Sequence, residues 1–235
     1  MLGYYYGFDM TYIYIVLPCL ILAMIASARV NSTFNRYSKQ ISARGLTGRE
    51  AALRVLSANG VTNVSIERVA GNLTDHYDPK ANVIRLSAPV YDSASTAAIG
   101  VACHEAGHAV QYAQNYAPIK LRAAIIPATN IGSKLALPLI LLGVLFGSSY
   151  TLIYLGIGLF SLSLVFQLVT LPVEFNASRR AMQAIENTNI LTDNELTGAR
   201  KTLTAAAMTY VAAVAVSAAQ LLRLILLFGG RRRND

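Results

Sequence analysis

Residues 121–173 read LRAAIIPATNIGSKLALPLILLGVLFGSSYTLIYLGIGLFSLSLVFQLVTLPV, and this stretch decides the fold class. A bilayer core of about 30 Å is crossed by roughly 20 predominantly apolar residues in a helix. The stretch is long enough for two crossings, which we expect over residues 123–146 and 150–171, joined by a short uncharged turn at Gly147-Ser148-Ser149. It therefore predicts a transmembrane helical hairpin.

The composition of the whole chain agrees with a membrane protein. Of its 235 residues, 54% are hydrophobic and 14% charged, whereas soluble domains average roughly 45–50% apolar and about 25% charged residues. These proportions exclude a disordered chain, and two cysteines exclude a disulfide scaffold. In a membrane protein the net charge of +8 is a topology signal, so no nucleic-acid partner is expected.

A further apolar segment, residues 12–28, precedes the hairpin and contains no charged residue. No Lys or Arg comes before it, so the basic leading region of a signal peptide is missing. Arg29 and Arg36 follow it instead, which places its carboxyl end in the cytoplasm. We expect a retained anchor with its amino end outside.

The last apolar segment, residues 205–228, leaves two alternatives open. It contains Arg223 and is followed by Arg231-Arg232-Arg233. If it spans the membrane, these three arginines lie outside, against the positive-inside tendency. If it re-enters or lies along the surface, they stay inside.

Between the anchor and the hairpin we expect a small cytoplasmic α+β unit. Residues 47–59 and 93–115 have helical patterns, the second capped by Ser93 or Ser95, and residues 64–69 and 83–86 are typical of short strands. The strand at 83–86 is expected to be an edge that pairs with an extended substrate.

The second of these helices contains His104-Glu105-Ala106-Gly107-His108. Residues four apart share a helix face, so both imidazoles can bind one zinc ion at about 2.0–2.1 Å. Glu105 is placed to take a proton from a zinc-activated water without binding the ion. The flanking residues are apolar or small, and buried histidines need partners. The pattern predicts a zinc site.

Catalytic zinc keeps three protein ligands and one open position, and two residues are serious candidates for the third ligand. Glu174 follows an odd number of crossings and is therefore expected on the cytoplasmic side, with His104 and His108. His76 lies in a polar turn and is either a solvated loop residue or, like the neighbouring Tyr77, a donor to the oxyanion. Zinc ligation by His76 is the weaker alternative, because it would close the position that water needs.

Several segments resemble a known family. His104–His108 followed after membrane spans by Glu174-Phe175-Asn176-Ala177 is similar to the pattern of HtpX-like and CaaX-processing membrane zinc peptidases. Asp75-His76-Tyr77-Asp78-Pro79 and Cys103–Gln111, CHEAGHAVQ, resemble the YugP-like membrane zinc metallopeptidases of bacteria more closely. The resemblance implies His104, His108 and Glu174 as ligands and Glu105 as catalytic base. In HtpX-like proteins an acidic residue stands where this chain has Ser178, so the carboxylate that would orient a ligand histidine must come from elsewhere or be absent.

Together these features predict a mainly α membrane protein: transmembrane helices plus a small cytoplasmic α+β zincin-like unit with an active-site helix. The expected segments are an N-terminal transmembrane anchor (residues 1–30), a metallopeptidase unit (31–120), a transmembrane hairpin (121–173), a cytoplasmic segment with the third ligand (174–204) and a C-terminal apolar helix with a basic tail (205–235).

The predicted function is a multi-pass zinc-dependent endopeptidase of the cell membrane, with one Zn²⁺ and its site on the cytoplasmic side. Its expected partners are protein or peptide substrates and the lipid bilayer. A different hypothesis is a non-catalytic membrane assembly or chaperone-like protein that keeps a vestigial zinc site. A transporter with Asn130 and Lys134 on a polar path is disfavoured, because the spans are few and no paired discontinuous helices are expected.

Overall fold

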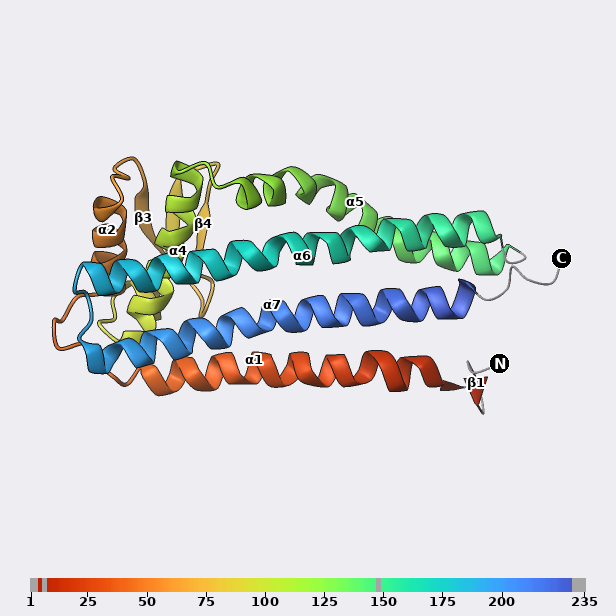
Figure 1. Ribbon diagram of the computed structural model, residues 1–235, viewed down its shortest axis with the longest axis horizontal. Helices are drawn as coiled ribbons and strands as arrows, with labels where there is room; N and C mark the ends of the chain where they lie inside the picture. The colour runs from red at the N-terminus through yellow and green to blue at the C-terminus, as the bar shows by residue number, and fades with distance from the viewer. Residues whose placement is uncertain (1–3, 6–7, 147–148, 230–235) are drawn as a thin grey trace. The chain divides into compact units, whose positions relative to one another are not determined.

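The chain is a mainly helical membrane protein (Figure 1). The computed structural model describes residues 4–5, 8–146 and 149–229. The predicted turn at Gly147 and Ser148 and the three arginines 231–233 lie outside the described residues. Within the described residues, four helices are long and apolar enough to cross a membrane. They are the run Tyr12–Tyr37, formed by η1 (Tyr12–Val16) and α1 (Leu17–Tyr37), then α5 (Ala117–Leu145), α6 (Tyr150–Asn187) and α7 (Asp193–Phe228).

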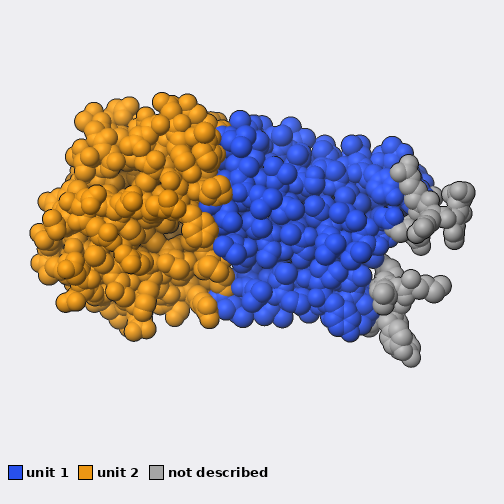
Figure 2. Space-filling model, viewed as in Figure 1, with its two compact units in different colours: residues 1–25, 121–171, 209–235 blue, residues 26–120, 172–208 orange. Residues whose placement is uncertain are grey.

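The chain forms two compact units, coloured separately in Figure 2. Unit 1 comprises residues 1–25, 121–171 and 209–235, and unit 2 comprises residues 26–120 and 172–208. The segment 205–228, whose crossing the sequence left open, is part of the 36-residue helix α7. Unit 1 also contains the short strands β1 (Tyr4–Tyr5) and β2 (Phe8–Asp9).

Within unit 1, α5 packs closely against α6 because glycines stand at the contact. A Cβ added to Gly132 would lie 3.0 Å from the carbonyl oxygen of Leu159, and one added to Gly156 would lie 2.7 Å from that of Ala136. Small residues let transmembrane helices approach in this way, and the close approach gains van der Waals contact. The two helices therefore pack directly against each other within unit 1.

Unit 2 contains a three-stranded sheet in the order β3 (Ser65–Val69), β5 (Val83–Ser87), β4 (His76–Asp78). β5 pairs in parallel with β3 and antiparallel with β4. The expectation that the strand at 83–86 is a substrate-binding edge is wrong, because β5 is the central strand. No pattern in the sequence predicted β4, and the turn expected around His76 is instead this edge strand.

The helices of unit 2 are fixed at their ends by side-chain caps. Thr47 and Glu50 form a capping box at the start of α2 (Gly48–Ala58), which satisfies two backbone N–H groups that the helix leaves unpaired. The Ser95 hydroxyl accepts from the Ala98 N–H at the start of α4 (Thr96–Ala113). The short helix α3 (Ala88–Tyr91) connects β5 to this cap.

Helix α4 lies in the core of unit 2 and is buried along most of its length. It is covered by α2 and by the parts of α6 and α7 that belong to unit 2. Two glycines allow this close packing. A Cβ on Gly107 would lie 2.8 Å from the Ala177 carbonyl oxygen of α6, and one on Gly100 would lie 3.3 Å from Ala199 of α7. The register between α4 and α6 is therefore fixed by direct backbone contact.

The substitution Gly107→Ala is expected to destabilise the protein by about 1–3 kcal/mol, the usual cost of overpacking a filled core. The added methyl group would meet backbone rather than a movable side chain. Gly158→Ala is the matched control, since a Cβ there has nothing within 4 Å. Thermal unfolding in detergent should show a lower midpoint for Gly107→Ala alone. Equal midpoints for the two variants would contradict this account of the α4–α6 contact.

Candidate metal centre

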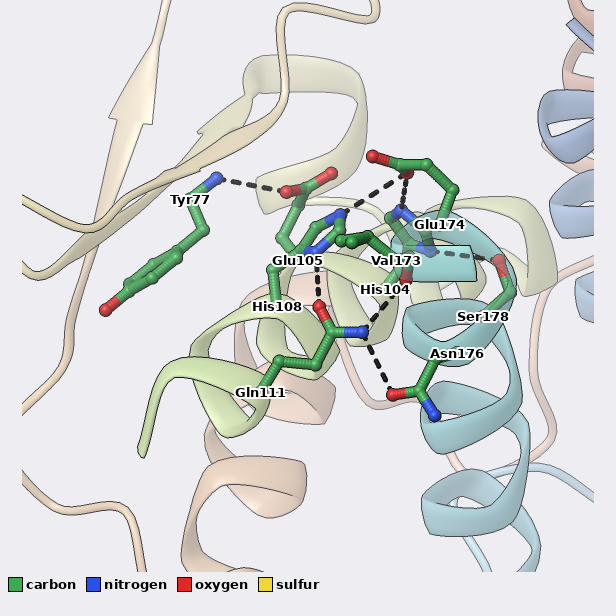
Figure 3. A network of polar contacts seen from close by, with 9 residues as sticks. All are labelled: Tyr77, His104, Glu105, His108, Gln111, Val173, Glu174, Asn176 and Ser178. Atoms are coloured by element: carbon green, nitrogen blue, oxygen red, sulfur yellow. Dashed lines mark hydrogen bonds and ion pairs between the residues drawn. The ribbon is translucent and has the colours of Figure 1, made fainter. Parts of the chain in front are cut away.

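Three side chains from two helices converge in unit 2. His104 and His108 lie one turn apart on α4, and Glu174 comes from α6 (Figure 3). Their possible ligand atoms all lie within 4.8 Å of one another. Glu174 Oε2 is 3.2 Å from His104 Nε2 and 3.4 Å from His108 Nε2. All three side chains are largely buried, with 4% of the Glu174 side chain exposed.

These distances suit a single tetrahedral ion. Ligand atoms about 2.0–2.1 Å from zinc in tetrahedral geometry are separated from one another by about 3.3 Å. The two separations between Glu174 Oε2 and the histidine Nε2 atoms, 3.2 Å and 3.4 Å, lie on either side of that value. Two imidazoles and one carboxylate form the donor set of many catalytic zinc sites and leave one position open. The residues present therefore fit a zinc ion.

A neutral hydrogen-bond partner orients each histidine. The Ser178 hydroxyl lies 3.1 Å from His104 Nδ1, and Gln111 Oε1 lies 3.0 Å from His108 Nδ1. If both Nε2 atoms bind a metal ion, each ring proton would lie on Nδ1 and be donated to this partner. Such partners fix the tautomer and orientation of ligand histidines. The carboxylate missing at position 178 is thus replaced by the Ser178 hydroxyl itself.

Gln111 also links the two helices that carry the ligands. Its side chain is fully buried, and its Nε2 donates to the Val173 carbonyl oxygen and to Asn176 Oδ1, each at 2.9 Å. Arg180 Nε donates to the same Asn176 oxygen at 2.7 Å. The amide of Gln111 therefore connects His108 directly to the backbone beside Glu174 (Figure 3).

Glu105 lies beside the three clustered side chains but is not one of them. Its Oε2 accepts a hydrogen bond of 3.0 Å from the backbone N–H of Tyr77 in β4. Burial raises the pKa of this carboxyl to about 7, which is the range in which a general acid–base residue works at neutral pH. The arrangement separates the Glu105 carboxyl from the three groups that could hold a metal ion.

Asp75 holds the strand that contacts Glu105. Its carboxylate accepts from the Ser87 N–H at 2.7 Å and from the Ser87 hydroxyl at 3.0 Å. This contact ties the start of β4 to the end of β5. Burial raises the pKa of Asp75. By fixing β4, Asp75 fixes the Tyr77 N–H that faces Glu105.

Neither the His76 imidazole nor the Tyr77 hydroxyl belongs to the described metal-ligating cluster. His76 is exposed, and its Nδ1 lies 2.8 Å from the Thr74 carbonyl oxygen. The Tyr77 hydroxyl donates to Asn82 Oδ1 at 2.6 Å, and its ring points away from the histidines in Figure 3. In this conformation Tyr77 contacts the site through its backbone only.

Sequence reasoning missed Gln111, and at position 178 it considered a carboxylate but not the Ser178 hydroxyl as a partner of a histidine. Gln111 follows His108 by three positions and Ser178 follows Glu174 by four, so helical spacing alone puts each on the face of its neighbouring ligand. That spacing is a usable signal. The Tyr77 N–H could not be found in this way, because its position depends on the pairing of β4 with β5.

Comparisons with known proteins agree with the geometry. A family model described as "Putative neutral zinc metallopeptidase" matches residues 12–229. The chain is 48% identical over 226 residues to a Bacillus subtilis (strain 168) protein named "Putative membrane protease YugP". The aligned residues cover 96% of this chain and 100% of that protein. No solved structure matches the chain.

Removing the carboxylate of Glu174 should abolish tight metal binding. We expect Glu174→Ala to lower zinc affinity by more than about 100-fold, since losing even an outer-shell partner costs about 10–100-fold. Glu186→Ala is the control, because Glu186 lies on the same helix but pairs with Arg200 at the surface. Zinc titration against a competing chelator measures the difference. Parental affinity in Glu174→Ala would show that the third ligand lies elsewhere.

Proposed function

The chain belongs to the family of zinc metallopeptidases whose model it matches over residues 12–229, and from this premise we propose that it is a membrane-embedded zinc endopeptidase. The observation that carries the proposal is the convergence of His104, His108 and Glu174, with Glu105 beside them. We propose these three residues as ligands of a single zinc ion and Glu105 as the catalytic base. The substrates are peptide bonds of proteins.

In this proposal each residue has a distinct task. Bound zinc supplies a Lewis acid that polarises the scissile carbonyl and lowers the pKa of water to about 7. Glu105 takes the proton from the attacking water and later delivers it to the leaving amine. The hydrogen bond from the Tyr77 N–H holds one Glu105 oxygen in place. Donation to the oxyanion by His76 or the Tyr77 hydroxyl stays a prediction.

The substitution Glu105→Gln tests the chemistry separately from metal binding. It removes the acid–base group but keeps the shape of the side chain, so zinc content should match that of the parent. Hydrolysis of labelled casein by the purified protein should fall by about 10²–10⁴-fold, the usual contribution of a positioned acid–base residue.

Glu67→Gln is the control, because Glu67 is exposed on β3, where its carboxylate pairs with Arg85. It should cleave casein at the parental rate. Undiminished hydrolysis by zinc-loaded Glu105→Gln would overturn the proposed mechanism. Absence of hydrolysis in the parent, under all conditions that load zinc, would favour the non-catalytic alternative.

We also propose that the site faces the cytoplasm. Unit 2 runs from the last part of α1 to the start of α5 and from the last part of α6 to the first part of α7. Four crossings would place both segments on one side of the membrane. Fourteen of the twenty Lys and Arg residues lie in unit 2. Basic residues favour the cytoplasmic side, which supports this orientation.

Labelling of an introduced cysteine tests the orientation. Asn72 is exposed in the loop between β3 and β4, whereas Cys103 is buried and Cys19 lies within α1. In intact cells Asn72→Cys should react with a membrane-impermeant maleimide only after permeabilisation. Ser149→Cys, in the turn between α5 and α6, should react without it. The reverse pattern would place the site outside the cell.

A further inference from the structure

Helix α5 carries a charged residue on the face opposite to its packing face. The buried residues of its membrane part recur at helical spacing and include Gly132, Ala136 and Ile140. Lys134 lies two positions from both Gly132 and Ala136, and side chains two positions apart in a helix point about 200° away from each other. Lys134 is accordingly exposed, together with Asn130 one turn earlier.

Lys134 also lies deep in the expected bilayer. Unit 1 contains α5 from residue 121 to residue 145, so Lys134 is about 20 Å and 17 Å from the two ends at 1.5 Å per residue. Its neighbour Gly132 packs against Leu159, near the middle of residues 150–171 of α6. A lysine side chain reaches only about 6 Å, too short to bring the amine from this depth to the lipid headgroups about 15 Å away.

Unit 1 offers this amine no carboxylate among its described residues. The sequence of unit 1 contains two acidic residues, Asp9 and Asp235. Asp9 accepts from Arg223 Nε at 2.7 Å, and Asp235 lies outside the described residues. Charged side chains within membranes are costly and are normally paired or in contact with water. The amine of the exposed Lys134 therefore needs a negatively charged partner from outside unit 1.

We propose that the face of α5 formed by Pro127, Asn130, Lys134, Leu137 and Leu141 is a docking site for a transmembrane helix of another protein. The partner helix carries an aspartate or glutamate near its middle. Its carboxylate pairs with Lys134 and accepts a second hydrogen bond from the Asn130 amide. All five side chains of this face are exposed, and the two leucines, 62% and 53% exposed, supply the apolar contact on one side of the charge.

A second copy of the chain fits this face less well. A symmetric contact through α5 would bring two Lys134 side chains together, and like charges in a low-dielectric surrounding repel strongly. Asp9 of the second copy could pair with Lys134 only by giving up its hydrogen bond with Arg223. The chemistry of the face therefore selects a partner with an unpaired carboxylate at mid-membrane depth. This proposal is independent of the proposed protease activity.

The test uses the full chain in phosphatidylcholine vesicles and three synthetic Leu/Ala transmembrane peptides with Asp, Asn or Leu at the central position. Energy transfer from a fluorophore on Ser149→Cys to the labelled peptide measures association. The Asp peptide should bind about tenfold more tightly than the Leu peptide, as expected for one interhelical polar contact. Lys134→Leu should abolish this difference, and Lys134→Asp should instead favour a peptide with central Lys.

Two controls keep the result specific. Unchanged zinc content shows that each variant is folded, since Lys134 is far in sequence from the metal ligands and faces away from the α5–α6 contact. In the second control, Lys134→Leu is combined with Leu155→Lys, which moves the charge to an exposed position on α6. The proposal would be overturned if this double variant bound the Asp peptide as tightly as the parent does. It would also be overturned if the parent bound the Asp and Leu peptides equally tightly. A change in self-association on Lys134→Leu would assign the face to a second copy instead.

Discussion

The hydrogen bonds of the buried Gln111 amide are the interactions on which the candidate metal centre depends. Its oxygen accepts from His108 and its nitrogen donates to the Val173 carbonyl oxygen, next to Glu174. These hydrogen bonds join a ligand on α4 to the backbone that carries the ligand on α6. An unpaired polar group at this depth would cost free energy, so the correct register satisfies Gln111 and a shifted register does not. The close approach at Gly107 enforces the same register by sterics.

Glu174, the third candidate ligand, is carried by α6, which runs from Tyr150 to Asn187. Within unit 2 the same helix carries Asn176 and Ser178, whose side chains hydrogen-bond to Gln111 and His104 of α4. These contacts hold Glu174 beside the two histidines.

The sequence predicted the parts whose physics is local. Apolar length revealed the spans, helical spacing brought His104 to His108, and the Ser95 cap was among the two residues expected to start α4. Crossing parity put Glu174 with the histidines, which the distances now support. The edge strand β4 could not be predicted, because three residues carry no periodicity and its place depends on pairing with β5. The wrong assignment of the substrate edge to residues 83–86 follows from that omission.

The hydrogen-bond partners of the histidines have a consequence for the metal. A carboxylate partner would raise the basicity of the imidazole and transfer negative charge toward the ion. Here both partners are neutral, the Ser178 hydroxyl and the Gln111 amide. In the proposed ligand set the Glu174 carboxylate is the one anionic group, so a bound Zn²⁺ would keep a net positive charge at the site. Such an ion polarises a carbonyl more strongly than a neutralised one. In the proposed peptidase, the neutral partners would therefore orient the ligands while preserving the Lewis acidity that peptide hydrolysis requires.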